Sequence, residues 1–182
     1  MLSVSILQLI VDAVATILGG VLLLRFWMQA IRVRPPASVG EFTFTLSDWL
    51  VRPLRRIVPG VGGYDWASLI GAFLVVGLAT CIYFLYGYSG ELVALKLLYR
   101  FLSWILYGLM ALLIVEAVFS WVNPHAPLAP FVRALNDPLL RHLRRIVPPL
   151  GGIDFSMLVA LILIQIVQLL LRGVFPPIIS AQ

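Results

Sequence analysis

Residues 50–65 read LVRPLRRIVPGVGGYD, and residues 139–154 read LLRHLRRIVPPLGGID. Both segments contain Arg-Arg-Ile-Val-Pro-x-x-Gly-Gly-x-Asp, and each runs directly into a long apolar stretch. A match this dense indicates that one unit has been duplicated, and the repeat is the first guide to the architecture. We therefore divide the chain into two repeats, residues 1–90 and residues 91–182.

The composition is that of an integral membrane protein. Hydrophobic residues make up 62% of the chain and charged residues only 12%, whereas about 25% of the residues of a typical soluble domain are charged. Four apolar stretches reach the ~20 residues that a transmembrane helix needs. They cover residues 5–31, 66–88, 101–122 and 155–172. No basic segment precedes the first stretch and Asp12 lies inside it, so we expect it to stay as a helix rather than be cleaved as a signal peptide.

The basic residues predict the orientation in the membrane. Cytoplasmic loops are enriched in Lys and Arg, and the segments after the first and third apolar stretches hold most of them, so both repeated segments should be cytoplasmic and both termini outside. These residues are Arg32, Arg34, Arg52, Arg55 and Arg56, then Arg133, Arg141, Arg144 and Arg145, against Lys96, Arg100 and Arg172 on the opposite side. The net charge of +5 then indicates contact with anionic lipid headgroups. It does not indicate nucleic-acid binding, because no aromatic residues are interleaved with the basic ones.

Each repeat is expected to form a transmembrane helix, a cytoplasmic amphipathic helix and a second transmembrane helix. In residues 45–58 and 131–147, apolar side chains recur every three or four positions among arginines, which is typical of a helix in the headgroup plane. We expect Asp48 and Asp137 near the starts of these helices and kinks at Pro53 and Pro138. The predicted fold class is all-α. An even number of crossings per repeat makes the two repeats parallel, related by a pseudo-two-fold axis along the membrane normal.

The end of each repeated segment predicts a helix stop, a turn and a helix cap. Proline cannot continue the amphipathic helix, and the glycine pair that follows can adopt backbone angles that turn the chain back toward the bilayer. Each aspartate directly before the next apolar stretch has two possible roles, an N-cap or an ion pair with the arginines. The motif residues are Arg55, Arg56, Pro59, Gly62, Gly63 and Asp65 in the first repeat, and Arg144, Arg145, Pro148, Gly151, Gly152 and Asp154 in the second.

Two charged residues inside the apolar stretches are candidates for function, because buried ionisable groups in membranes are costly. Arg25 and Glu116 lie at similar distances from the cytoplasmic ends of the first and third stretches. One hypothesis is a direct ion pair between them across the repeat interface. The alternative is that Arg25 extends to the headgroups and that Glu116 is protonated or bonded within its own helix bundle.

Weaker polar signals have structural interpretations. Gln165 and Gln168 share a helix face and are expected to bond neighbouring helices. Asp12 is expected to find a polar contact near Lys96 or Arg100.

The remaining reactive side chains do not predict catalysis. Cys81 lies in an apolar stretch and is expected to be a small core residue, while His125 and His142 stand without a second metal ligand at helical spacing. No nucleophile elbow or phosphate loop is present in the sequence. We therefore expect no enzyme activity, no metal and no cofactor.

The chain resembles the YggT family of small bacterial and plastid membrane proteins. The resemblance rests on SWVNP at residues 120–124, DPLLR at residues 137–141 and RRIVPPLGGIDFS at residues 144–156, with a degraded copy in the first repeat. The family pattern tends to place arginine where this chain has Glu116, and here only the first repeat, at Arg25, keeps it. The resemblance transfers no catalytic residues.

The resemblance implies a role in a bacterial inner membrane. Plastid relatives look like assembly factors for covalent haem attachment to a membrane cytochrome, and bacterial relatives are associated with osmotic tolerance and envelope or division organisation. Two functions are therefore considered. The first is a non-enzymatic scaffold or assembly factor, which docks lipid headgroups, a protein partner or a second copy of the chain. The second is a small oligomeric ion channel or transporter that is active under osmotic stress. A continuous polar stripe that could line a pore is missing from the apolar stretches, which favours the scaffold.

Overall fold

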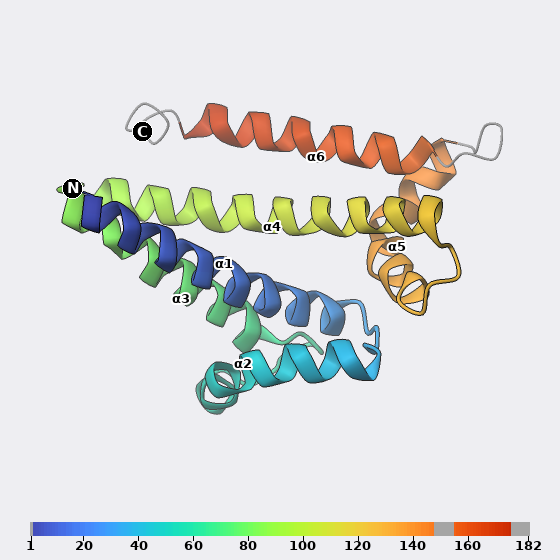
Figure 1. Cartoon of the computed structure of the whole chain (residues 1–182), viewed down its shortest axis with the longest axis horizontal. Helices are drawn as coiled ribbons and strands as arrows, with labels where there is room; N and C mark the ends of the chain where they lie inside the picture. The colour runs from blue at the N-terminus through green and yellow to red at the C-terminus, as the bar shows by residue number, and fades with distance from the viewer. Residues whose placement is uncertain (1, 148–154, 176–182) are drawn as a thin grey trace.

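The computed structural model describes residues 2–147 and 155–175, and these form helices joined by short connections (Figure 1). The helices are α1 (Leu2–Ala30), α2 (Ala37–Ile57), α3 (Trp66–Thr80), the 3₁₀ helix η1 (Cys81–Tyr86), α4 (Gly90–Val122), α5 (Ala129–Ile146) and α6 (Phe155–Val174). Four spans in α1, α3 with η1, α4 and α6 are long and apolar enough to cross a membrane. The predicted all-α fold with four spans is confirmed.

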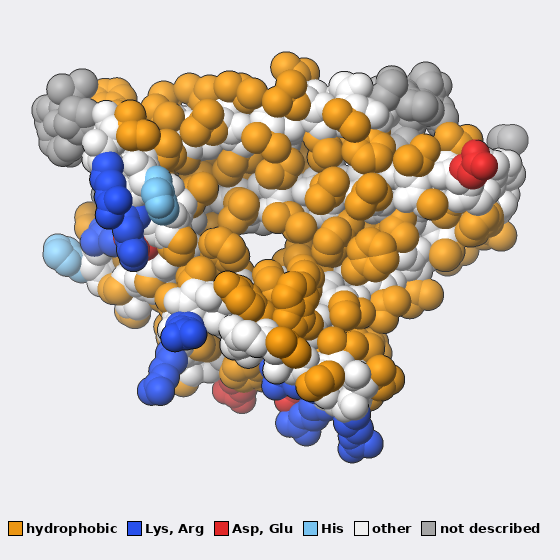
Figure 2. Space-filling view, turned by 180° about the vertical axis from the view of Figure 1, so that it is seen from behind, with side chains coloured by type: hydrophobic (Ala, Val, Ile, Leu, Met, Phe, Trp, Pro, Cys, Tyr) orange, Lys and Arg blue, Asp and Glu red, His pale blue; other side chains and the backbone are white. Residues whose placement is uncertain are grey.

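The two repeats have the same order of elements. In the first, α1 packs along α3, and α2 contacts both of them; in the second, α4 packs along α6, and α5 contacts both. The beginning of α1 and the end of α6 lie at the left of the view, whereas α5 lies at the right and α2 runs along the lower edge, beneath α1 and α3 (Figure 1). Lys and Arg side chains gather over the region of α2 and α5, while apolar side chains cover the face between the two ends (Figure 2).

The amphipathic helix α2 differs from the expected one. It begins at Ala37 rather than residue 45, directly after Pro36, and it continues through Pro53, so Asp48 lies well inside the helix and not near its start. The helix α5 likewise contains both Asp137 and Pro138 in its interior. Neither proline ends its helix, and the ribbons of α2 and α5 change direction along their length (Figure 1), as expected for helices kinked at a proline.

The helix α4 begins at Gly90 instead of residue 101, because its charged residues find partners. Ser89 caps the helix by accepting from the backbone N–H of Leu92. The ammonium of Lys96 lies 4.0 Å from the ring centre of Tyr83 and 4.6 Å from that of Tyr88, a cation–π arrangement. Arg100 forms a 2.6 Å ion pair with Asp12 of α1, which confirms the contact expected for Asp12.

Two groups of contacts join the repeats. On the side where α1 begins, Asp12 pairs with Arg100 of α4, and just past the middle of α1 Gly19 packs against the indole of Trp104 of α4. Toward the other end, Trp27 of α1 donates from Nε1 to the carbonyl of Leu135 in α5 at 2.9 Å. This second contact is part of an apolar cluster between the repeats that includes Met28, Phe131, Val132 and Leu135.

The Gly19 contact gives a direct test of how α1 and α4 pack. A Cβ atom added at Gly19 would lie 2.3 Å from Cζ3 of Trp104, whereas one at Gly20 would meet nothing within 4 Å. We expect Gly19→Ala to destabilise the protein by about 1–3 kcal/mol through overpacking. Gly20→Ala should be neutral or slightly stabilising, since alanine is the better helix former. Unfolding midpoints in detergent, followed by tryptophan fluorescence, compare the two variants, and equal midpoints would contradict the close approach.

Candidate functional site

A buried charge cluster surrounds Arg25 where α1, α2 and the start of α3 meet. The Arg25 residue is only 5% exposed. Its Nη1 donates to Ser47 Oγ at 2.6 Å and to Asp48 Oδ1 at 2.7 Å, both on α2. Its Nε lies 3.5 Å from Oδ2 of Asp65, the residue before α3. The guanidinium thus ties the amphipathic helix to both membrane-spanning helices of its repeat.

Asp65 combines the two roles that the sequence left open. It is the N-cap of α3, where it accepts from the backbone N–H of Ser68 at 3.4 Å and from the Ser68 hydroxyl at 2.6 Å. It also accepts two hydrogen bonds from Arg55, from Nε at 3.2 Å and from Nη2 at 2.5 Å. A forked pair of this kind fixes orientation as well as charge. The turn before it uses Gly62 and Gly63 at φ of 69° and 84°, in the left-handed region that glycine tolerates.

The ionisation of the cluster follows from these contacts. Burial alone would raise the pKa of Asp65, but the hydrogen bonds from Arg55 and Ser68 outweigh it and hold the pKa below its ordinary value of 3.8. The hydrogen bond from Arg25 lowers the pKa of Asp48 in the same way. The bond to Asp65 raises the pKa of Arg55. Near neutral pH both carboxyl groups are therefore charged and paired.

The second repeat builds a related cluster with a carboxylate at its centre. Glu116 on α4 is 5% exposed. Its Oε2 accepts from Asn136 Nδ2 at 2.8 Å, and its Oε1 lies 3.6 Å from Nη2 of Arg144, both on α5. In the register of the repeat, Asn136 occupies the place of Ser47, and Arg144 occupies the place of Arg55. The position of Ser47 and Asn136 therefore contacts a cation in one repeat and an anion in the other, whereas Arg55 binds Asp65 and Arg144 approaches Glu116 itself.

The structure does not bring Arg25 and Glu116 together. Arg25 binds Ser47, Asp48 and Asp65 of its own repeat, and Glu116 binds residues of the second repeat. At this depth α1 and α4 are separated by an apolar cleft, so the nearest polar groups for each charge are on its own amphipathic helix. The hypothesis of a direct pair is replaced by two clusters, one in each repeat.

The two arginines of the repeated Arg-Arg pair have different environments. Arg55 and Arg144 point toward the clusters, whereas Arg56 and Arg145 are exposed and have no ion pair within residues 2–147 and 155–175. Pro59 follows the end of α2. The expected turn and cap at Pro148, Gly151, Gly152 and Asp154 lie outside the described residues.

Sequence reasoning missed Ser47 and Asn136, which complete the clusters. Each directly precedes the aspartate of its amphipathic helix, and the Arg52–Asp48 pair recurs as the Arg141–Asp137 pair. A signal was available, because both repeats place a hydrogen-bonding residue before this aspartate. The choice between serine and asparagine matches the charge that it contacts, since the hydroxyl accepts from arginine and the amide donates to glutamate.

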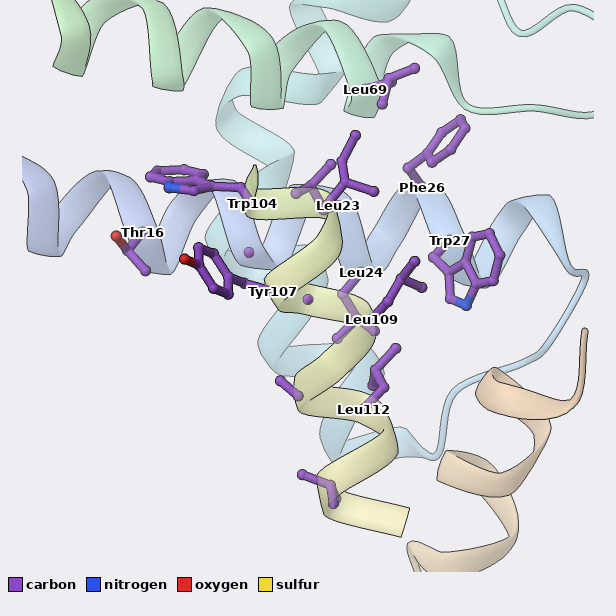
Figure 3. A pocket seen from close by; sticks show the side chains of 15 residues that line it. Thr16, Leu23, Leu24, Phe26, Trp27, Leu69, Trp104, Tyr107, Leu109 and Leu112 are labelled. Atoms are coloured by element: carbon purple, nitrogen blue, oxygen red, sulfur yellow. The ribbon is translucent and has the colours of Figure 1, made fainter. Parts of the chain in front are cut away.

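A second candidate site is the cleft between the repeats, with a volume of about 760 Å³. Apolar side chains of α1 and α4 line most of it, among them Leu23, Leu24, Trp104, Leu109 and Leu112 (Figure 3). The space-filling surface is hollowed through in this region (Figure 2). Apolar cavities do not retain water, so the cleft suits hydrocarbon rather than an ion.

Other predicted positions are placed as follows. Gln168 is half-buried and its Nε2 has no hydrogen-bond partner within the described residues, while Gln165 is exposed. Cys81 is exposed, so the expectation of a core cysteine was wrong; it lies at the start of η1. His125 and His142 are exposed. Within residues 2–147 and 155–175, no group of three or more His, Cys, Asp or Glu could hold a metal ion.

The fold and the paired clusters define a multi-pass membrane protein built from two repeats, each with an amphipathic helix anchored by a buried charge. The chain belongs to the CCB3/YggT family, whose model matches residues 4–85 and again residues 95–175. It is 31% identical to the uncharacterized YggT protein of Escherichia coli K12, over 82% of this chain and 80% of that protein. It is 34% identical to the uncharacterized protein PA0392 of Pseudomonas aeruginosa, over 82% and 80% of the two chains. No solved structure matches the chain.

The two-cluster arrangement predicts the outcome of a charge swap. Arg25→Glu places a carboxylate beside Asp48 and Asp65, and Glu116→Arg places a cation beside Arg144. We expect each change to destabilise the protein by about 3 kcal/mol or more, and the double variant to be no more stable than the two losses combined. The exposed control Arg56→Glu should unfold like the wild type. The unfolding midpoint in detergent compares all four variants. A double variant that is more stable than the two single variants would support a direct ion pair between Arg25 and Glu116.

The lowered pKa values of Asp48 and Asp65 predict acid sensitivity with a defined sign. A carboxyl group whose pKa is lower in the folded state stabilises the protein above its unfolded value of 3.8, and loses that contribution as pH falls through the folded value. The unfolding midpoint should therefore be insensitive to these groups above about pH 5 and fall below pH ~4. Asp65→Asn should flatten this fall, whereas Asp137→Asn, at the half-buried position that corresponds to Asp48, should keep it. The same slope in both variants would contradict the assignment.

Proposed function

We propose that this chain is a non-enzymatic scaffold or assembly factor of the bacterial inner membrane, with α2 and α5 on the cytoplasmic surface and both termini outside. In this role the two amphipathic helices contact anionic headgroups and dock a protein partner. The processes that such a scaffold would serve are envelope organisation, tolerance of osmotic stress or assembly of a membrane complex.

The observation that supports this proposal is the unequal use of the repeated arginine pair. One arginine of each pair, Arg55 or Arg144, stabilises the fold through the buried cluster. The other, Arg56 or Arg145, is exposed on the last turn of the helix. Arginine heads at the end of a membrane-surface helix attract anionic lipid and acidic protein surfaces, at about 1 kcal/mol per basic residue near an anionic leaflet.

The anchoring of α2 also supports a docking role. Helices α1 and α3 hold it: Arg25 of α1 binds Asp48, Asp65 before α3 binds Arg55, and Leu50 and Leu54 of α2 pack on the apolar core between these helices. A surface fixed in this way loses little conformational freedom when a partner binds, which favours affinity. Its uncovered side still presents Trp49 and Ile57, which are 63% and 79% exposed.

An ion channel or transporter is the second candidate, and the observation that favours it is the presence of Arg25 and Glu116 at membrane depth. Both are held in separate clusters, and the cleft between them is lined by apolar residues. Conduction requires polar or charged groups along the path. A pore within a single chain is therefore disfavoured, and a flux measurement distinguishes the two candidates.

The test compares two charge variants of the full chain. Arg56→Glu with Arg145→Glu should reduce both the anionic phospholipid and the partner protein that co-purify from host membranes in mild detergent, each by severalfold. Arg56→Lys with Arg145→Lys keeps the charge and should keep both. The folded state should be unchanged in both variants, because neither arginine contributes to a cluster.

Two results would contradict the scaffold proposal. If equal amounts of lipid and partner protein co-purify with the Glu and the Lys variants, the charge of the exposed arginines has no role in docking. Ion flux in proteoliposomes of the wild type that Glu116→Gln abolishes, with the unfolding midpoint preserved, would instead support the channel.

A further inference from the structure

The helix α6 is covered on one side only. Its contacts are chiefly with α4 and α5, and it lies at the edge of the molecule with α4 on one flank (Figure 1). Its counterpart in the first repeat, α3, packs against α1, α2 and α4. The repeat thus leaves one face of α6 without the helix neighbours that its counterpart has.

A polar residue lies in the middle of this open face. Gln165 is near the midpoint of Phe155–Val174, is exposed, and makes no hydrogen bond within residues 2–147 and 155–175. At that depth a bilayer offers neither donors nor acceptors, and an unsatisfied amide there is strongly unfavourable. The side chain is long enough to reach a group on another helix but is too near the centre for easy contact with water.

The residues around Gln165 form a regular seam. Leu158, Ile162, Gln165 and Leu169 follow one another at spacings of four, three and four, which is the spacing of the contact positions in a left-handed helix pair. The three apolar members are 55%, 47% and 68% exposed.

We propose that α6 is a homodimer interface, in which the seam packs against the same seam of a second copy and the two Gln165 side chains bond each other. A carboxamide carries both a donor and an acceptor, so two copies related by a two-fold axis satisfy each other. Copies inserted in the same orientation place Gln165 at the same depth, and a two-fold axis along the membrane normal makes the paired helices parallel. Lipid tails cannot satisfy the amide, and the second copy brings the complementary group in register.

Disulfide trapping in native membranes tests the seam on the full chain. The exposed native thiol is first removed by Cys81→Ser. Single cysteines are then placed on the seam, by Ile162→Cys or Leu169→Cys, and on the other exposed flank of α6, by Leu163→Cys or Leu170→Cys. We expect oxidation to give disulfide-linked dimers from the seam positions and severalfold fewer from the flank positions. Equal yields from both sets would overturn the proposal.

Substitution of Gln165 tests the hydrogen bond separately from the packing. Gln165→Leu keeps an apolar helix that inserts and folds, and should weaken dimerisation by about tenfold, as an interhelical hydrogen bond in membranes would. Gln165→Asn retains the amide and should retain most of the dimer. The dimer fraction of purified protein, measured by single-molecule photobleaching in vesicles over a range of lipid-to-protein ratios, compares them. A dimer that Gln165→Leu leaves unchanged, or a wild type that stays monomeric at every ratio, would overturn the proposal.

Discussion

The structure depends on the pairing of one buried cation. A guanidinium in a low-dielectric region must find compensating charge, because an unpaired ion there is far more costly than the pairing is favourable. Arg25 finds that charge in Asp48 on the amphipathic helix and in Asp65 at the start of the next membrane helix. Three elements that are separate in the sequence are thereby fixed relative to each other, and the exposed face of α2 acquires a defined position.

The second repeat solves the same problem with the opposite sign. Glu116 occupies the central position, and its partners are Asn136 and Arg144. Asp137, which corresponds to Asp48, pairs with Arg141 on its own helix. The repeated architecture thus accepts either charge at the centre of the cluster. The residue before the aspartate changes with that charge, from Ser47, which accepts from arginine, to Asn136, which donates to glutamate. The two halves of the chain can diverge electrostatically while they keep one architecture.

Much of this architecture could be predicted from the sequence, and the reasons are local. Apolar stretches of sufficient length define the membrane spans, the duplicated segment defines the repeats, and Asp65 directly before an apolar stretch indicates a cap. The partners of Arg25 could not be predicted in this way. Equal depth along two helices suggested Glu116, but lateral separation depends on how α1 and α4 pack, and that is set by Gly19, Trp104 and the cleft beyond them. The start of α2 at Ala37 was also missed, because the apolar periodicity that predicts this helix begins only at residue 45.

The cleft between the repeats is closed at both of its ends. The Arg100–Asp12 pair and the Gly19–Trp104 contact join α1 to α4 at one end, and the Trp27–Leu135 bond joins α1 to α5 at the other. The cleft therefore does not run across the bilayer from one surface to the other. Hydrocarbon that occupies the cleft must enter laterally, by diffusion within the plane of the membrane. The two repeats cannot separate to admit a larger molecule unless one of these contacts between them breaks first.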